Sequence, residues 1–336
     1  MELASVLENI CSVTIGIRDG KCDILSGTVP QGLSLETLSA PVGNHDRFAA
    51  LIPEWNHVPN FNDGVGLVID IPGGVTLDKP VGVLLSAGSC NIVISAAARA
   101  QAEFIFVYSD VKSVGRFAVT GEETSLRIRD IVVAESQNNM NIGSWVKLDR
   151  NTSVDVATVE LSNCNISMDY GFEFGLPGGD LKHAALSVIG GSCTKTLDIN
   201  VKHAVPECRS DVVMKGIAFG EGFGTFNGLV YVAPDAQHTE AYQQSRNMIL
   251  SDKARIVTSP QLEIYADDVK CSHGAAVGQM NDDAVYYMRQ RGLSDAEART
   301  LQLSGFVNEI VARLDVPELV EELSAVAQER INSLPH

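Results

Sequence analysis

Short apolar runs separated by turn residues extend over most of the chain. Glycine, proline, asparagine and aspartate separate the runs, and apolar and polar residues alternate within many of them, which is typical of β-strands. The clearest runs lie at residues 83–85, 92–94, 104–107, 126–133, 154–161, 184–189, 197–201, 212–219 and 229–232. Many short strands at regular spacing indicate a sandwich, a barrel or a stacked β-solenoid, and the pattern alone leaves these three open.

The pattern becomes helical near residue 281. Asn281 is placed to begin a helix that ends at Gly292, and Ser294 with Glu297 has the spacing of a capping box for the next helix. A further helical segment begins at Pro317. The apolar face of these helices either packs on the protein's own core or binds a partner, and truncation after Gly292 is expected to leave a soluble β core.

These patterns divide the chain into three regions. Residues 1–60 contain a short helical start and a possible hairpin near residues 16–27. Residues 61–280 contain the predicted strands, and residues 281–336 form the helical C-terminal region. We expect the second region to supply the core of the fold, because it holds most of the apolar runs.

Composition narrows the classes of function. The 336 residues include 45% hydrophobic and 20% charged residues, and the formal net charge is -17. A nucleic acid or an anionic membrane is therefore disfavoured as the main partner, because phosphate binding needs clustered lysine and arginine. The sequence contains no G-x-x-x-x-G-K-[ST] phosphate loop, so ATP hydrolysis is not expected from this chain.

The cysteines and the N-terminus bear on location. The seven cysteines are scattered without C-x-x-C spacing, which argues against a disulfide framework or a zinc ribbon. Burial as small hydrophobic residues is the expectation for Cys90, Cys164 and Cys193. The N-terminus lacks the pattern of a signal peptide and no apolar run is long enough to cross a bilayer, so we expect a cytoplasmic protein.

Cys271 and His273 are the strongest candidates for chemistry. They stand at positions i and i+2, so an extended backbone projects both side chains from one face of a strand. A thiolate and an imidazole are both ligands for iron, and Gly274 permits close approach of a partner. His203 and Cys208 form a second pair, for which hydrogen bonding within a turn is the expected role.

One long stretch near the C-terminus resembles a known family. Residues 259–306 read SPQLEIYADDVKCSHGAAVGQMNDDAVYYMRQRGLSDAEARTLQLSGF. The stretch resembles the C-terminal core of the SufB/SufD family, the scaffold proteins of the SUF system of iron–sulfur cluster assembly, and its SufD branch in particular. Ser272-His273-Gly274 stands where SufB proteins have a His-Glu-Ala string. The resemblance implies a right-handed parallel β-helix core, with an abbreviated N-terminal region at 1–60.

The resemblance also implies a role. The protein would be a non-catalytic scaffold subunit that pairs with SufB, with a homodimer possible in isolation. Its C-terminal helices would dock the ATPase SufC, which supplies ATP hydrolysis. A nascent iron–sulfur cluster would be built at the SufB–SufD interface, with His273 as a ligand and Cys271 as a weaker candidate. The isolated chain would hold no tightly bound cofactor.

The alternative function is a β-helix polysaccharide lyase or hydrolase. Asp267, Asp268 and His273 would then act as acid and base groups. The negative net charge suits an acidic polysaccharide poorly, and aromatic residues for stacking on sugars make up only 6% of the chain. Since a fold shared with such enzymes does not establish their function, we favour the scaffold role.

Overall fold

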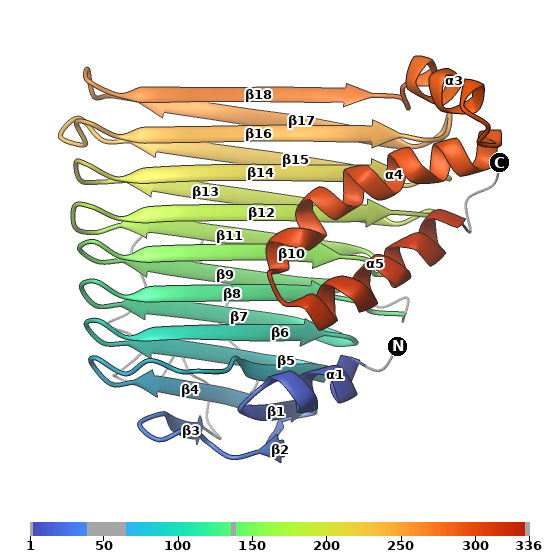
Figure 1. The fold of residues 1–336 in the computed structure, drawn as a ribbon. Coiled ribbons are helices and arrows are strands. Elements are labelled where there is room, and N and C mark those ends of the chain that lie inside the picture. Colours follow the sequence, from blue (N-terminus) through green and yellow to red (C-terminus); the bar gives the residue numbers. More distant parts are fainter. Residues whose placement is uncertain (1–2, 39–64, 136–138, 333–336) are drawn as a thin grey trace.

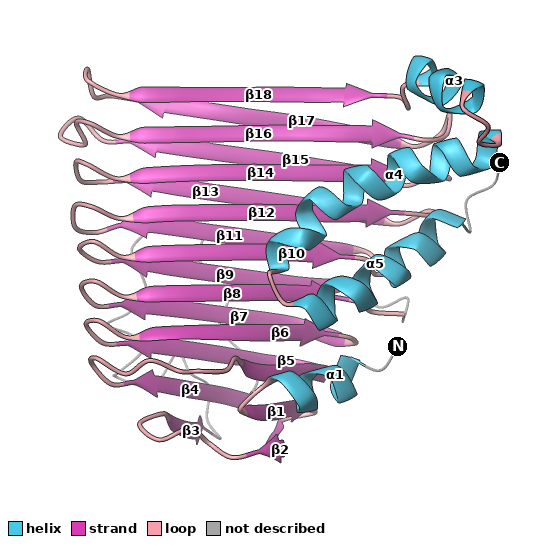
Figure 2. Cartoon of the chain, in the orientation of Figure 1, coloured by secondary structure: helices cyan, strands magenta, loops and turns pink. Residues whose placement is uncertain are grey.

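The computed structural model describes residues 3–38, 65–135 and 139–332. In these residues the chain winds into a parallel β-helix in which two strands form each coil (Figure 1). Figure 2 shows that strands dominate the fold and that helices lie on one side of it. The mainly β class, the parallel β-helix core and the C-terminal helical region are therefore confirmed.

Successive coils stack their strands into two parallel sheets. Sheet A contains β1 (Val13–Arg18), the first part of β5 (Val81–Ala96), β6 (Gln101–Tyr108), β8 (Ser125–Val132), β10 (Ser153–Glu160), β12 (Asp180–Ile189), β14 (Arg209–Ala218), β16 (Glu240–Ile249) and β18 (Lys270–Gly278). Sheet B contains β4 (Val65–Ile71), the second part of β5, β7 (Val111–Thr120), β9 (Met140–Leu148), β11 (Ile166–Phe174), β13 (Thr194–His203), β15 (Phe223–Val232) and β17 (Arg255–Ile264). Two further strands pair in antiparallel fashion, β2 (Lys21–Gly27) with β1 and β3 (Ser34–Leu38) with β4.

Residues one coil apart lie directly opposite each other. Ser153 of β10 is opposite Ser125 of β8, 28 positions earlier, and Asp180 of β12, 27 positions later. Because side chains alternate along each strand, every second residue points between the two sheets, and the same inward positions recur in each coil. These inward residues form one continuous apolar core along the stack.

Charged residues interrupt this core near its middle. Arg116 of β7 and Asp130 of β8 are 1% and 0% exposed, and their Nη2 and Oδ2 atoms are 2.8 Å apart. The hydroxyl groups of Tyr108 and Tyr170 each donate a hydrogen bond of 3.0 Å to the Asp130 carboxylate. The buried carboxylate therefore has both a counter-charge and hydrogen-bond donors, as burial of a charge requires.

Helices α1 (Leu3–Ile10), α4 (Asp295–Val311) and α5 (Pro317–Asn332), with the short 3₁₀ helix η2 (Ala312–Leu314), cover the outer face of sheet A. Helix α3 (Asp282–Gln290) lies beyond the end of β18 and packs on α4 (Figure 1). Apolar residues of α1, α4 and α5 and of the strands beneath them make a second core. Two basic side chains anchor the helices: Arg129 Nε donates to Leu314 O at 2.9 Å, and Lys215 Nζ donates to Phe306 O at 3.1 Å. The inner faces of α1, α4 and α5 thus pack on the protein's own core.

The predicted helix starts are confirmed. The Asn281 side chain accepts a hydrogen bond from the backbone N–H of Ala284 at 3.0 Å, and Ser294 with Glu297 forms a complete capping box. Pro317 is the first residue of α5. No helix of the described ranges is both long and apolar enough to cross a membrane.

The N-terminal region is only partly described, since residues 39–64 lie outside the described ranges. The expected hairpin is present as β1 and β2, which pair in antiparallel fashion around Asp19 and Gly20. β1 also pairs in parallel with the first part of β5, so this hairpin is continuous with sheet A. The division into regions 1–60, 61–280 and 281–336 stays a prediction.

Candidate functional site

Cys271 and His273 lie on β18, the last strand of the stack. In the register with β16, Cys271 is opposite Ala241 and His273 is opposite Gln243. Ala241 and Gln243 are 0% and 1% exposed and point between the sheets, so Cys271 and His273 also lie on the inward side. The structure therefore places the two predicted site residues on one face of an extended strand, as their spacing indicates.

His273 is nevertheless exposed, because the stack ends at this strand. Within the described residues β18 pairs with β16 on one side and with no strand on the other. Figure 1 shows β18 at the end of the coils, away from β1. A position that would be core in any earlier coil is thus open to an incoming molecule.

Cys271 is a poorer candidate than His273. Its side chain is half-buried and packs against the apolar core between the sheets. Burial raises the pKa of the Cys271 thiol above its ordinary value, against the smaller opposing effect of a backbone hydrogen bond at Ala241. Because the thiolate is the form that ligates a metal, a raised pKa weakens Cys271 as a ligand.

A shallow surface pocket of about 320 Å³ lies beside His273. Both edges of the pocket come from the last two strands of sheet A. The lining residues are Gln243, Gln244, Ser245, Arg246, Ser272, His273, Gly274, Ala275 and Ala276. The pocket is therefore built from the β16–β18 pair alone, the last two strands of sheet A.

The interior beneath this pocket is polar. Ser245 and Thr258 lie with their hydroxyl oxygens 2.8 Å apart, and the Asn247 amide donates to Ser245 Oγ at 2.9 Å. Gln243, Ser245 and Asn247 are all at least nine-tenths buried. The sequence did not single out Gln243, although a run of polar residues in β16 was a signal that could have done so.

The residues of the polysaccharide hypothesis are not brought together. Asp267 and Asp268 lie in the turn between β17 and β18. Asp268 Oδ2 is 3.0 Å from His238 Nδ1, and its backbone N–H donates to Gln237 Oε1 at 2.9 Å, so it ties one turn to the next. His273 is five residues further along, about 16 Å in an extended strand. The structure does not favour acid–base catalysis by this set.

His203 and Cys208 have the structural role that the sequence indicated. His203 is fully buried, its Nε2 is 2.9 Å from Ser210 Oγ, and its ring stacks on Phe174 with centroids 4.5 Å apart. Burial lowers the pKa of His203 to about 3, so the imidazole is neutral near pH 7. The Cys208 thiol donates to Pro206 O at 3.3 Å. No cluster of three or more potential metal-ligand side chains occurs in the described part of the chain.

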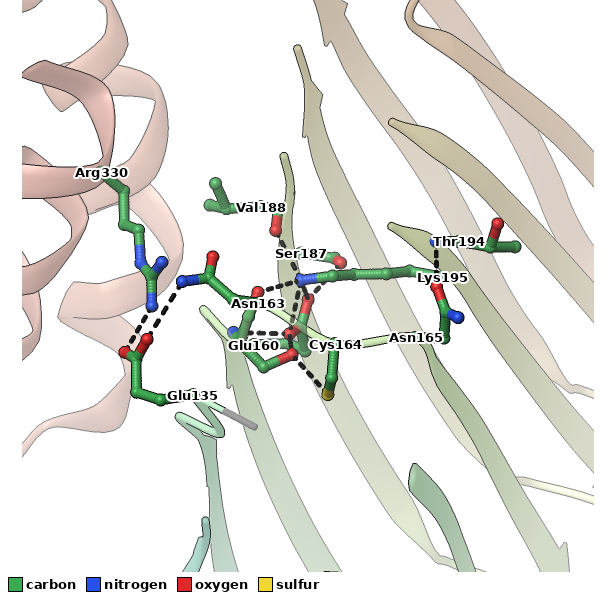
Figure 3. Close-up of polar contacts among 11 residues, drawn as sticks. Glu135, Glu160, Asn163, Cys164, Asn165, Ser187, Val188, Thr194, Lys195 and Arg330 are labelled. Carbon is green, nitrogen blue, oxygen red and sulfur yellow. Dashed lines mark hydrogen bonds and ion pairs between the residues drawn. The ribbon is translucent and has the colours of Figure 1, made fainter. Parts of the chain in front are cut away.

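A second buried group of polar residues surrounds Lys195 (Figure 3). The Lys195 ammonium is 2.8 Å from Glu160 Oε2 and donates to the backbone oxygens of Ser162 and Val188, each at 2.7 Å. Since its charge and its donors are all used, this group ties the end of β10 to β12 and β13 and offers no free ligand. Cys90 and Cys164 are buried as expected, whereas Cys193 is partly exposed.

Comparison with known proteins assigns the family. The sequence model described as SUF system FeS cluster assembly, SufBD core domain, matches residues 86–306, which span the described coils from β5 to β18 and reach into α4. The chain belongs to the SufB/SufD family. The resemblance carried by residues 259–306 is thereby confirmed over a much longer range.

Individual SufB/SufD relatives are similar over different lengths. An iron–sulfur cluster assembly SufBD family protein of Mycobacterium tuberculosis is 27% identical over 273 residues, which are 77% of this chain and 68% of that protein. The SufD protein of Escherichia coli is 33% identical over 178 residues, 48% of this chain and 42% of that protein. A SufBD family protein of Synechocystis is 38% identical over 135 residues, 40% and 30% of the two chains. The chain thus spans less than half the length of the last two SufB/SufD relatives.

Proposed function

We propose that this chain is the SufD-like subunit of a SUF scaffold. It pairs with a SufB protein in the cytoplasm, binds the ATPase SufC, and lets a nascent iron–sulfur cluster form at the SufB–SufD interface. The observation that supports this most strongly is the position of His273, which lies on the inward face of the last strand and is exposed. A partner that covers the end of the stack would enclose the imidazole between the two proteins.

The last coil has the character of a surface that a partner covers. Apolar side chains are exposed around it, with Val257 at 48%, Ile264 at 39% and Val277 at 42%. An exposed, unpaired edge strand with apolar neighbours is a template for pairing with another chain. These features support pairing with SufB, and a second copy of this chain is the alternative occupant when SufB is absent.

The chemistry of His273 suits a cluster that has to be passed on. The cluster is cargo rather than a resident cofactor, so its ligands must hold it and then release it. An imidazole offers one neutral nitrogen ligand, and thiolates of the partner would supply others. Mixed nitrogen and sulfur ligation should make a more labile site than four thiolates, which fits a scaffold better than a storage site.

SufC binding is assigned to the outward faces of the C-terminal helices. The inward faces of α4 and α5 already pack on sheet A, whereas Tyr286 and Tyr287 of α3 and Leu301 of α4 are 64%, 58% and 55% exposed. Exposed aromatic residues of this kind are frequent in protein interfaces. Leu301→Glu should therefore weaken capture of SufC while leaving the fold unchanged.

The deciding experiment is the substitution His273→Ala in a complex made by co-expression with SufB and SufC. We expect the complex to assemble normally and to form far less cluster under anaerobic conditions, as measured by bound iron and sulfide. Ser272→Ala is the matched control, because Ser272 is the neighbour on the opposite face of β18. His273→Cys should restore part of the cluster, since a thiolate replaces imidazole as an iron ligand.

Full cluster formation by a correctly assembled His273→Ala complex would remove His273 from the site. Turnover of an acidic polysaccharide by the isolated chain, lost in Asp268→Asn, would instead revive the lyase or hydrolase alternative. Neither result depends on the SufC assignment, which the capture experiment with Leu301→Glu tests separately.

A further inference from the structure

Gln243 is a buried amide beside the candidate ligand. It lies on β16, its side chain is 1% exposed, and it lines the pocket that His273 also lines. Its Nε2 donates to the backbone oxygen of Gly228 at 3.3 Å. Its Oε1 is buried and has no hydrogen-bond partner among the described residues. A buried carbonyl oxygen without a hydrogen-bond donor lowers the stability of the fold, so Gln243 Oε1 is an acceptor that the protein keeps at the expense of stability.

The neighbouring strand makes room for this amide. Gly228 of β15 has no side chain, and a Cβ built there would lie 2.4 Å from Gln243 Oε1 and 2.6 Å from its Cδ. The amide therefore rests against the backbone of β15, where any larger residue would displace it. Gly228 and the Nε2 hydrogen bond together fix which amide atom is left free.

The strand register places a side chain with an N–H donor opposite Gln243 on β18. Gln243 and His273 are direct partners in the strand register, and neighbouring strands are about 4.8 Å apart. Asn247 also has an unpartnered buried oxygen, but its partner in the register is Val277, which has no side-chain donor. Cys271 lies opposite Ala241, so within the β16–β18 pair Gln243 alone combines an unsatisfied acceptor with an opposite side chain that carries an N–H.

We propose that Gln243 accepts a hydrogen bond from one ring N–H of His273 and so leaves the other ring nitrogen unprotonated toward the open end of the stack. A neutral imidazole has one donor nitrogen and one acceptor nitrogen, and a hydrogen bond at the donor decides which tautomer is present. Histidines that ligate metals usually donate their second N–H to such an acceptor. Gln243 is then a positioning residue for the cluster ligand, an inference that rests on the proposed function.

The first test uses the isolated chain and needs no cluster. The ¹⁵N shifts of the His273 ring, assigned by comparison with His273→Ala, report the tautomer at neutral pH. The wild-type chain should hold one tautomer predominantly, and Gln243→Met should shift the ring toward a mixture. Gly228→Ala should do the same by displacing the amide. Tyr242→Phe is the control, because Tyr242 is the neighbour of Gln243 on the outer face of β16 and does not line the pocket.

Gln243→Met is expected to fold, because replacing a buried unpaired acceptor by an apolar group of similar length removes a desolvation penalty. Urea unfolding of the same samples checks this. A purely structural role of Gln243 would alter the unfolding midpoint and leave the His273 tautomer unchanged. An unchanged tautomer in a folded Gln243→Met chain would overturn the inference even if His273 proves essential.

The second test uses the complex with SufB and SufC. Gln243→Met should lower the affinity of the interface for iron by about 10- to 100-fold, the usual effect of losing the hydrogen-bond partner of a ligating histidine. Tyr242→Phe should retain iron as the wild type does. Full cluster formation by the His273→Ala complex would show that His273 is not a cluster ligand, which would contradict the proposed function. The tautomer measurement would still decide whether Gln243 accepts a hydrogen bond from His273.

Discussion

Arg116 and Asp130 carry opposite charges in the middle of an otherwise apolar core. Because Arg116 and Asp130 are 1% and 0% exposed, water cannot solvate either charge when its partner is removed. Tyr108 and Tyr170 depend on the same carboxylate, and burial, the largest influence, raises the pKa of both phenols well above the ordinary value. The network thus holds β6, β7, β8 and β11 in one register.

Arg116→Leu should therefore destabilise the protein by about 3–5 kcal/mol, since it leaves a buried carboxylate without its counter-charge. Urea unfolding followed by circular dichroism measures the change. Arg116→Leu combined with Asp130→Leu should recover much of the loss. Glu221→Gln, at an exposed ion pair with Lys253, is the control and should change nothing measurable. A small effect of Arg116→Leu alone would contradict the assignment.

The buried histidines predict a loss of stability in acid. Burial lowers the pKa of His203 to about 3 and that of His183 to about 4, against an ordinary value of 6.5. Below pH 6.5 the unfolded chain binds protons that the folded chain does not, so stability falls as the pH drops toward these values. Each histidine contributes at most about 1.4 kcal/mol per pH unit in that range.

His203→Gln should make this acid dependence shallower. The measurement is the unfolding free energy at several pH values between 4 and 7, compared with the wild-type chain. Near pH 7 the variant is expected to be the less stable of the two, because it loses the contact with Phe174. An identical slope in both proteins would show that His203 takes up its proton in the folded state.

The candidate site was predictable only in part. Two positions separated by one residue on an extended strand share a face whatever the fold, so the common orientation of Cys271 and His273 followed from spacing. That this face is the inward one, and that Gln243 lies opposite His273, depends on the register between β16 and β18, which no local pattern encodes. The network of Arg116 and Asp130 was missed for the same reason.

At the scale of elements, many strands were predicted and several were not, including β11, whose inward residues such as Phe172 and Phe174 are apolar. β7, β9, β11 and β16 were absent from the predicted runs. In β7 the inward residue Arg116 breaks the alternation, and in β16 the inward residues Gln243, Ser245 and Asn247 are polar. A strand with polar residues on its buried side lacks the alternation of apolar and polar positions, so its sequence resembles that of a loop. The helices were predicted well because their caps are local signals.

Burial beneath α4 and α5 changes the expected result of a truncation. The sequence led us to expect a soluble β core from a chain that ends at Gly292. The structure shows that Ile105, Leu186 and Ile217 of sheet A lie under these helices with at most 1% exposure. Removing the helices would bare this contiguous apolar face.

We therefore expect the chain truncated after Gly292 to aggregate, or to bind a hydrophobic dye strongly, when it is purified. Full-length Leu301→Glu is the matched control, since it alters an exposed side chain of α4 and should stay monodisperse. Size-exclusion chromatography with light scattering separates the outcomes. A monodisperse truncated chain with wild-type unfolding behaviour would show that sheet A does not need its helical cover.

At the scale of the whole molecule, each coil contacts only its neighbours, so stability is expected to vary along the stack. β10 pairs with strands on both sides, whereas β18 pairs only with β16 in the described structure. Amide hydrogen exchange should therefore be fastest in β18 and slowest in the middle coils. Adding SufB should slow exchange in β18 selectively. Uniform protection along the free chain would contradict this gradient.

The two anchors of α4 have a consequence for the length of the protein. Lys215 on β14 and Arg129 on β8 stand three strand spacings apart, about 14 Å. Their acceptors, the oxygens of Phe306 and Leu314, are eight residues apart along α4 and η2, about 12–14 Å. The separation of the two acceptors along the helices thus matches the separation of the two donors along the coils. Deleting one coil between β8 and β14 would bring Arg129 and Lys215 about 5 Å closer together and leave the separation of Phe306 and Leu314 unchanged. Coils are therefore expected to be gained or lost only outside the stretch from β8 to β14.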